Sequence, residues 1–251
     1  MRTVRTIDFI RFFRQRLANL KQLEVATPST CLYPHASFNP ELNILLGAEL
    51  DALSRHWAIA EGRAPMSHQA TVGAFLDAHG GPAWKKCSHI DLLDRAKLET
   101  AQHARGKKKT TVDPSPRLAA LQAAMDRMLA PIAKDEYVVL SWEQDLDLEA
   151  ISQAPEITTS GVPLSWLQAS RYGEIFYRYH RNAWVHALDP DPKLQVELYH
   201  VLGPDRPPHY LHHDGKRKLA IPEPFVLVSF ERALNSFERS MAQRDEMIVG
   251  S

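Results

Sequence analysis

The sequence predicts a mainly α-helical protein, a helical bundle with a small β-hairpin inserted before the C-terminal helix. Three observations support this fold class. Apolar residues recur every three or four positions along most of the chain. Serines stand at N-cap positions before two of these stretches. Late in the chain, Asp214-Gly215 separates two short mixed runs, as in a hairpin turn. With 251 residues and 44% hydrophobic content, a single domain over 1–251 is expected.

Two long helices are expected in the first sixty residues. Over residues 6–20 the apolar side chains fall mostly on one face, with arginines between them. The second helix is expected to begin near Pro40, which suits a first helical turn, behind Ser37 or Asn39 as the cap. Its leucines recur at helical spacing as far as Trp57, a pattern typical of a central core helix.

Shorter helices are expected in the middle of the chain. Ser67 is expected to begin one that Gly80-Gly81 ends, and Ser88, followed three residues later by Asp91, forms a near capping box for another. Helical patterns resume at 117–132 and from Val162 to about His186. Residues 135–148 fit either a short strand or a helical continuation, because their apolar run is too short for periodicity to decide.

Two non-helical segments complete the predicted organisation. Residues 104–116 carry two prolines and almost nothing apolar, which predicts an exposed loop. The loop contains the one dense basic run, and its charges either guide RNA through phosphate contacts or are simply solvated. A hairpin-like insertion is expected at about 193–221, and a long helix follows it. The basic residues of the loop are Arg105, Lys107, Lys108 and Lys109.

Charge and cysteine content limit the classes of function. Thirty basic residues balance thirty acidic ones, so any nucleic-acid binding must use local patches. The two cysteines are far apart, which supports neither a disulfide framework nor a cysteine zinc site and fits a reducing cytoplasm. The N-terminal stretch has no uninterrupted apolar core, and no run of about 18 apolar residues occurs. A soluble cytoplasmic protein without membrane contact is expected.

The segment RYHRNAWVHAL, residues 178–188, combines residue types suited to metal-free RNA cleavage. His186 can exchange a proton near neutral pH, Arg181 offers a planar set of donors to phosphate oxygens, and Asn182 can orient either of them. At 100° per residue, Asn182 and His186 share a stripe with Arg178, which is therefore a candidate RNA contact. The alternative is that these are ordinary polar residues at the edge of a helix.

The same segment resembles the HEPN family (higher eukaryote and prokaryote nucleotide-binding), whose signature is an arginine, a polar residue and a histidine four to six residues after the arginine. Here the signature is Arg181, Asn182 and His186. The helical stretch LNILLGAELDALSRHWA is also similar to a long helix of many members. The resemblance covers residues 37–60 and 165–245. Toxin-type members often carry a tyrosine two residues after the histidine, where this chain has Leu188.

The resemblance implies a metal-independent endoribonuclease without cofactors. Family members dimerise with their motif helices facing each other, which implies a homodimer with a composite site built from two copies of Arg181, Asn182 and His186. It also implies an RNA substrate, a role in toxin–antitoxin or anti-phage defence, and an antitoxin or regulatory protein as a further partner. The alternative is a non-catalytic helical module that binds nucleotide, RNA or a protein.

Three other groups have both a functional and a structural interpretation. Glu49 and Asp51 are candidates to hold Arg181 or Arg178; the default alternative is an exposed face or an ordinary helix–helix ion pair. The histidines of HYLHHDG, with Asp214, offer metal ligands but lack an H-E-x-x-H or cysteine partner, so a polar hairpin without metal is favoured. The aromatic residues near the motif are expected to lie in the core or at a dimer interface in preference to stacking on bases, and of these two the interface is favoured. The histidines are His209, His212 and His213; the aromatic residues are Tyr172, Phe176, Tyr177, Tyr179 and Trp184.

Overall fold

The computed structural model describes residues 6–26, 40–106, 113–128, 138–141, 144–181, 207–213 and 216–249. Within these ranges the protein is mainly α-helical, with a small antiparallel sheet before its last helix, as predicted. The helices are α1 (Thr6–Ala26), α2 (Pro40–Ala60), α3 (His68–Phe75), α4 (His89–Ala104), α5 (Ser115–Met128), α6 (Leu148–Gln153), α7 (Pro155–Ser160), α8 (Leu164–Ala169), α9 (Tyr172–Ile175) and α12 (Glu223–Val249).

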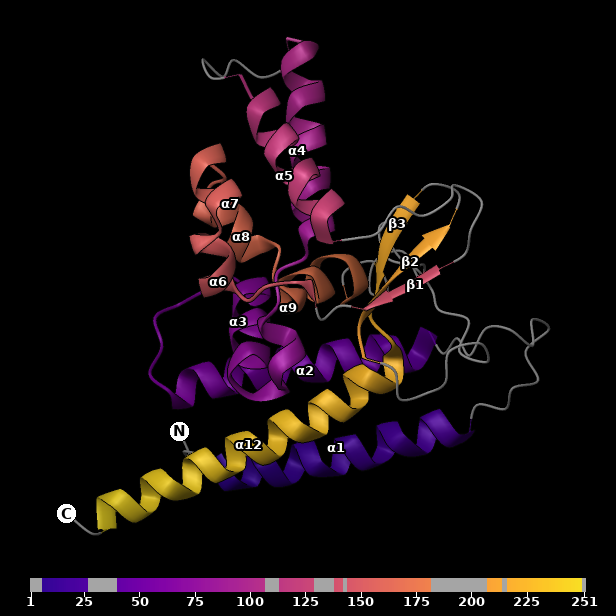
Figure 1. The fold of residues 1–251 in the computed structure, drawn as a ribbon. Helices are drawn as coiled ribbons and strands as arrows, with labels where there is room; N and C mark the ends of the chain where they lie inside the picture. Colours follow the sequence, from indigo (N-terminus) through magenta and orange to yellow (C-terminus); the bar gives the residue numbers. More distant parts are fainter. Residues whose placement is uncertain are drawn as a thin grey trace.

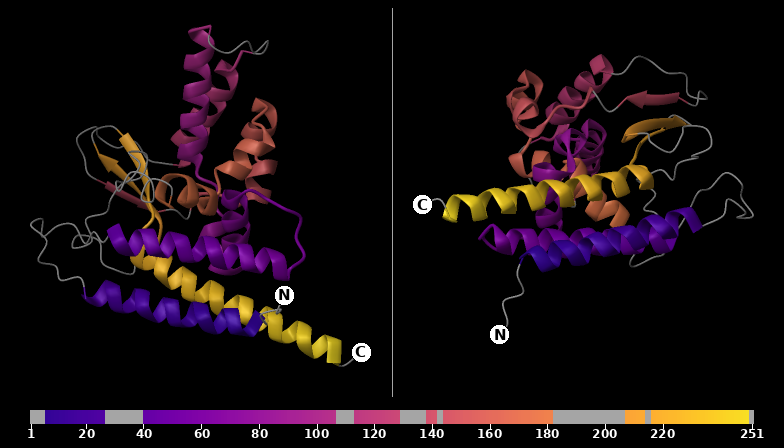
Figure 2. Two further views of the ribbon diagram at one scale, coloured as in Figure 1. Left: turned by 180° about the vertical axis from the view of Figure 1, so that it is seen from behind. Right: turned by 90° about the horizontal axis from the view of Figure 1, so that it is seen from below.

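The long helices α1, α2 and α12 lie side by side and form the base of the molecule (Figures 1 and 2). Helices α4 and α5 form a pair that protrudes from the rest of the molecule, with α6, α7 and α8 beside it. The predicted apolar faces are buried: α1 contributes residues from Ile10 to Leu20, and α2 contributes residues from Leu42 to Trp57. Ion pairs also join α1 to its neighbours, such as Lys21 Nζ with Glu231 Oε2 of α12 at 2.8 Å.

The sheet contains β1 (Val138–Ser141), β2 (His209–His213) and β3 (Lys216–Ala220) in the order β1-β2-β3, with both pairings antiparallel. Tyr210 on β2 lies opposite Leu140 on one side and Leu219 on the other. The segment that fitted either a strand or a helix therefore contributes a strand, and the predicted hairpin is confirmed in its β2 and β3 arms. Residues 193–206 of the expected insertion, and the Asp214-Gly215 turn, lie outside the described residues.

The two predicted serine caps are present. The backbone N–H of Ala70 donates to Ser67 Oγ at 3.2 Å, and that of Asp91 donates to Ser88 Oγ at the same distance. Gly81 ends the Ser67 helix with a φ of 112°, a conformation that favours glycine. The last turn of this helix is a π-helical segment, η1 (Leu76–Gly80), followed by the 3₁₀ turn η2 (Pro82–Lys85).

The continuous helix expected from Val162 to His186 is wrong, because the described part of it is broken after α8. Arg171 is extended, with φ −64° and ψ 146°, and pairs with Cys87 in an isolated antiparallel bridge. The N–H of Ser88 donates to the carbonyl of Ser170 at 2.8 Å, and the N–H of Tyr172 donates to the carbonyl of Lys86 at 2.9 Å. These long-range backbone bonds replace the helical ones, so the chain restarts as α9 and the π-helical segment η4 (Phe176–Arg181).

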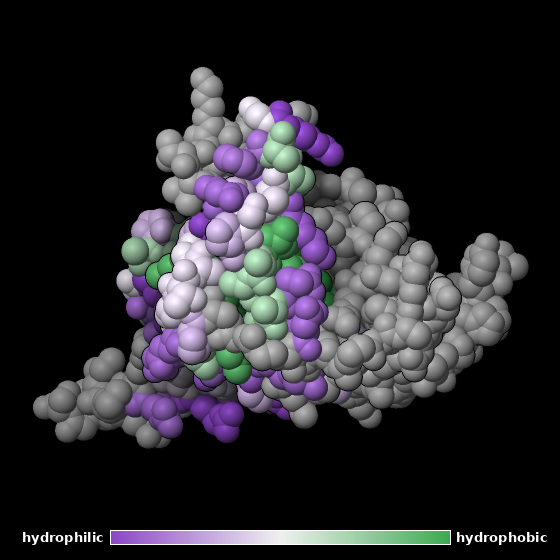
Figure 3. Space-filling view, turned by 45° about the horizontal axis from the view of Figure 1, so that its top comes forward, coloured by the Kyte–Doolittle hydropathy of each residue, from purple (hydrophilic) through white to green (hydrophobic). Residues whose placement is uncertain are grey.

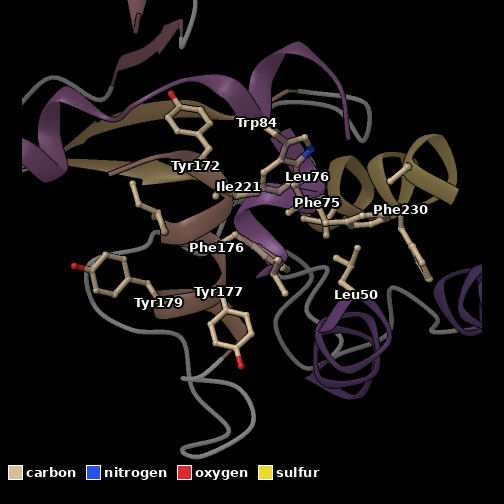
Figure 4. Packing of buried hydrophobic residues seen from close by; sticks show 14 of the residues in the cluster. Leu50, Phe75, Leu76, Trp84, Tyr172, Phe176, Tyr177, Tyr179, Ile221 and Phe230 are labelled. Carbon is tan, nitrogen blue, oxygen red and sulfur yellow. The ribbon is translucent and has the colours of Figure 1, made fainter. Parts of the chain in front are cut away.

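Helices α3 and α9 cross at a contact between two glycines. A Cβ atom added at Gly173 would lie 2.9 Å from the Cα of Gly73, closer than such atoms approach in real structures. The contact lets α9 lie against the central cluster, where Phe176 packs on Trp84 with ring centroids 5.7 Å apart. Figure 4 shows Trp84, Leu76 and Phe75 between the α9–η4 segment and Phe230 of α12.

Gly173→Ala is expected to lower the free energy of unfolding by about 1–3 kcal/mol, although alanine favours a helix over glycine by about 1 kcal/mol. The new methyl group meets backbone atoms of α3, which cannot rotate away as a side chain can. Urea denaturation measures the effect. Ser165→Ala at an exposed position of α8 is the matched control, with an expected change within about 0.5 kcal/mol. Equal stability of Gly173→Ala and wild type would contradict the close crossing.

Candidate functional site

The candidate motif begins at the end of the helical segment formed by α9 and η4. Arg181 is the last residue of η4, and its side chain, Asn182 and His186 lie outside the described residues. The segment from 176 to 181 is π-helical, with i→i+5 hydrogen bonding, so the 100° step of an α-helix does not apply there. The predicted stripe through Arg178 therefore does not follow from α-helical geometry.

Arg178 makes its contacts within the chain. Its Nη2 donates to the carbonyl of Ala169 and lies 4.0 Å from Asp91 Oδ2, while its Cζ lies 4.6 Å from the centroid of the Tyr179 ring. The side chain is 23% exposed. A guanidinium held in this way has little freedom to meet a phosphate, so the contacts favour a structural role for Arg178 over the predicted RNA contact.

The aromatic face near the motif is buried inside the single chain. Figure 4 shows the hydroxyls of Tyr172 and Tyr179 directed away from Trp84 and Phe75. For the four aromatic residues that are described, the core alternative holds and the favoured dimer interface does not, because α2, α3 and η2 already cover them; Trp184 lies outside the described residues. The exposed fractions are 0% for Tyr172, 1% for Phe176, 6% for Tyr177 and 8% for Tyr179.

A buried carboxylate, Asp91 of α4, contacts the segment formed by α9 and η4. Its Oδ2 accepts hydrogen bonds from Arg95 Nε and Ser170 Oγ, both at 2.6 Å. Its Oδ1 accepts one from the Tyr179 hydroxyl at 3.2 Å, and Arg178 lies 4.0 Å from Oδ2. Helix α4, the break after α8 and segment η4 are thus joined through one side chain that is only 9% exposed.

A second buried carboxylate, Asp145, accepts hydrogen bonds from the sheet and from α9. His89 Nδ1 lies 2.7 Å from Asp145 Oδ1, and the Tyr172 hydroxyl donates to Oδ2 at 2.6 Å. The Tyr210 hydroxyl of β2 also contacts Oδ2 and lies 3.1 Å from Ser88 Oγ. Because Ser88 also caps the helix that carries Asp91, the two carboxylates belong to one connected polar network.

The chemistry of this network favours a structural role. Burial, followed by the negative charge of Asp145, raises the pKa of Tyr172 and of Tyr210 well above the ordinary value, so both phenols stay protonated and donate. The pair of His89 and Asp145 has the form of an acid–base dyad, yet their side chains are 4% and 1% exposed. Groups so enclosed offer no surface to a polymeric substrate. The network fastens the sheet and the motif segment to α4.

The sequence predicts only part of this network. The capping signal at Ser88 predicts the start of the helix that carries His89 and Asp91, and it is the part of the network that the sequence indicates. Tyr210 lies inside the histidine-rich run HYLHHDG, whose histidines were considered as metal ligands, so the tyrosine was not predicted to belong to a polar network. Asp145 carries no local signal, because its partners come from residues 56 positions before it and 65 after it.

A third ionic group lies where α3 meets α9. Arg171 donates through Nη1 to Asp77 Oδ2 and through Nη2 to Glu174 Oε1, the latter at 3.1 Å. Burial raises the pKa of Asp77 to about 6 from its ordinary 3.8; the positive charges of Arg171 and Lys85 lower this pKa, and the negative charge of Glu174 raises it. The loss of hydration therefore outweighs the ion pair at Asp77.

Asp77→Asn is expected to become relatively more stabilising as the pH rises. The folded protein holds the Asp77 proton more tightly than the unfolded chain does, so the stability from protonated Asp77 is complete below about pH 4 and lost as the pH passes about 6. The unfolding free energy of Asp77→Asn minus that of wild type should therefore rise by on the order of 2 kcal/mol from pH 4 to pH 7.5. Urea denaturation across this range measures it, and a constant difference would contradict the burial of the carboxylate.

The two acidic residues singled out on α2 have partners within the chain. Glu49 Oε1 accepts a hydrogen bond from Arg16 Nε at 2.6 Å, which confirms the helix–helix ion-pair interpretation for this residue. Asp51 Oδ2 lies 3.4 Å from His68 Nδ1 and 3.7 Å from the Arg55 guanidinium. The described partner of Arg178 is Asp91, so neither carboxylate of α2 is shown to hold that arginine.

The basic loop begins at the end of the protruding α4–α5 pair. Arg105 follows α4 and is exposed, whereas Lys107, Lys108 and Lys109 lie outside the described residues. Arg117 of α5 donates to Glu99 of α4, which ties the two helices together. Figure 3 shows a mixed surface on this side, with hydrophobic residues in small groups between hydrophilic ones.

The histidine-rich strand has a clear structural contact. His209 is buried, and its Nδ1 lies 2.8 Å from the carbonyl of Pro207, while the side chains of His212 and His213 are not described. Among the residues that the structure describes, no group of three histidine, cysteine, aspartate or glutamate side chains is arranged to hold a metal ion. Burial raises the pKa of the Cys87 thiol to about 12, so this cysteine is a poor nucleophile.

In the described residues, two buried carboxylates, Asp91 and Asp145, join the α9–η4 segment and the small sheet to α4. No described helix has the length and apolar character needed to cross a membrane. No protein-family model matches the sequence, no curated protein matches it, and no solved structure matches it.

Proposed function

We propose that the protein is a HEPN-type endoribonuclease that cleaves RNA without a metal ion. The observation that supports this most is the position of Arg181 at the end of a helical segment whose aromatic side chains are buried. A reactive group placed on such a segment has a fixed starting position, which efficient catalysis requires. The motif chemistry adds a histidine for proton transfer and an asparagine to orient it.

The proposed reaction is transesterification within the RNA strand. The ribose 2′-oxygen attacks the adjacent phosphorus, its proton passes to His186, and the bond from phosphorus to the 5′-oxygen breaks. The leaving 5′-oxygen takes up a proton, supplied by the second His186 of a composite site. Arg181 stabilises the phosphate as its negative charge grows, and Asn182 orients the histidine or the ribose. The products are a 2′,3′-cyclic phosphate and a 5′-hydroxyl end.

A homodimer is part of this proposal, since two copies of the motif supply both proton-transfer groups. An isologous contact brings identical residues together across a two-fold axis. The contact must use surfaces other than the buried aromatic face of α9 and η4. An antitoxin or regulatory protein would restrain such an enzyme in toxin–antitoxin or anti-phage defence, which is the role that the family resemblance implies.

One observation favours a second candidate function, a non-catalytic module that binds nucleotide, RNA or protein. The guanidinium of Arg178 is occupied by Ala169, Asp91 and Tyr179 inside the chain. If Arg181 is occupied in the same way, neither Arg178 nor Arg181 is available to stabilise a reacting phosphate.

Cleavage of labelled RNA is expected to persist in EDTA and to require a 2′-hydroxyl at the scissile nucleotide, because the proposed nucleophile belongs to the RNA. Gel analysis of an all-RNA strand, the same strand with one 2′-deoxy position, and an all-deoxy strand measures this. Phosphatase-resistant 3′ ends that become sensitive after acid treatment would identify the cyclic phosphate. Activity on the all-deoxy strand, or loss of activity in EDTA with recovery on adding Mg²⁺, would reject the mechanism.

A further inference from the structure

We infer that Asp91 is a positioning residue for the motif, and that its carboxylate fixes the π-helical turn that ends at Arg181. This inference rests on the proposed function for its consequence in catalysis. The structural part of the inference, that the carboxylate of Asp91 holds segment η4 in place, does not depend on that function.

The contacts of Asp91 concentrate on the residues just before the motif. Its Oδ1 accepts from the Tyr179 hydroxyl at 3.2 Å, and its Oδ2 lies 4.0 Å from Arg178 Nη2. Tyr179 and Arg178 precede Arg181 by only two and three residues. On the other side, Arg95 Nε and the Ser170 hydroxyl hold the same carboxylate at 2.6 Å. The carboxylate therefore links α4 and Ser170, which precedes α9, to the π-helical segment η4 that ends at Arg181.

The contact with Arg178 requires an acidic residue at position 91, because the guanidinium is positively charged. Arg178 is 23% exposed, and Asp91 is its one ion-pair partner among the residues that the structure describes. The Nε of Arg178 is buried without a hydrogen-bond partner in the same part of the chain. Without the carboxylate charge of Asp91, this guanidinium would keep the carbonyl of Ala169 and the ring of Tyr179 as its described contacts.

The π-helical geometry of residues 176–181 explains why the contacts of Asp91 affect the direction of Arg181. A π-turn holds one more residue than an α-turn and is less favourable, so it persists where outside contacts compensate for it. Release of Tyr179 and Arg178 would let residues 176–181 return to α-helical spacing. A shift of one residue turns the following side chain by roughly 100° about the helix axis. Arg181 would then face a different direction, although its own chemistry is unchanged.

The test compares Asp91→Asn and Tyr179→Phe with Asp94→Asn, a control on the same helix whose side chain is 54% exposed. Amide hydrogen exchange of residues 176–181, followed by mass spectrometry, is expected to be at least about tenfold faster in Asp91→Asn and unchanged in the control. Tyr179→Phe removes a single hydroxyl and should show a smaller increase, which keeps the test valid if Asp91→Asn fails to fold.

The kinetic arm uses RNA cleavage in EDTA. The kcat of Asp91→Asn is expected to fall by about 10–100-fold with KM within about threefold of wild type, since misplacement of a catalytic group affects the transition state more than binding. Unchanged exchange in both variants would overturn the inference whatever the RNA result. Faster exchange with unchanged kcat would overturn the positioning role. Faster exchange beside an inactive wild type would refute the proposed function while leaving Asp91 as the anchor of η4.

Discussion

His186→Ala is expected to lower the rate of RNA cleavage by about 10²–10⁴-fold while the melting temperature stays unchanged. In the proposed mechanism the imidazole supplies proton transfer, and alanine cannot replace it. Initial rates on a labelled RNA in EDTA, with differential scanning calorimetry of the same samples, measure both quantities. Arg181→Lys should also lose much of the activity, because lysine keeps the charge but not the planar fork of donors.

The matched control for this experiment is His68→Ala. His68 has a side chain that is 55% exposed and lies at the start of α3, so its removal should leave cleavage at the wild-type rate. A marked fall in the melting temperature of His186→Ala beside an inactive wild type would show that the imidazole is a core hydrogen-bonding group. That result would end the nuclease proposal and favour the non-catalytic module.

Asp145→Ala is expected to lower the free energy of unfolding by about 3–5 kcal/mol, the largest stability effect anticipated for a single side chain here. The carboxylate is 1% exposed and accepts from Tyr172, Tyr210 and His89. Its removal leaves buried donors without an acceptor and frees β2 from α9. Urea denaturation with a far-ultraviolet circular dichroism signal measures the change.

Two further variants distinguish the loss of the hydrogen bonds to Asp145 from non-specific effects of substitution in this region. Tyr210→Phe removes one donor and leaves the carboxylate with its others, so its expected cost is about 1 kcal/mol. Glu149→Ala, at a nearby exposed position of α6, should change stability by less than about 0.5 kcal/mol. Equal effects of Asp145→Ala and Glu149→Ala would mean that the buried bonds contribute little.

Features that depend on neighbouring residues were predictable from the sequence. The N-caps at Ser67 and Ser88 depend on side chains that bond backbone groups three residues ahead, and the apolar faces of α1 and α2 depend on a local period. The hairpin arms β2 and β3 likewise lie next to each other along the chain. For such elements, the residues that specify the structure and the residues that they contact lie close together in the sequence.

Features that depend on distant partners were not predictable. The break between α8 and α9 exists because residues 170–172 bond to residues 86–88, about 80 positions earlier. Arg178 resembled a surface residue by helical periodicity, but its partner Asp91 lies on another helix, and the π-turn alters the periodicity itself. For the motif, the sequence supplies the residue types at 181, 182 and 186; the convergence of their side chains stays a prediction.

The packing of α1 against α12 also has a consequence for biosynthesis. These helices are separated by about 200 residues, yet α1 buries Ile10, Phe13 and Leu17 in a core to which α12 contributes. At ribosomal rates, α1 emerges on the order of 10–40 s before α12. During that interval its apolar stripe lacks this cover and is open to non-native contacts. The base can therefore complete its packing only after α12 has been translated.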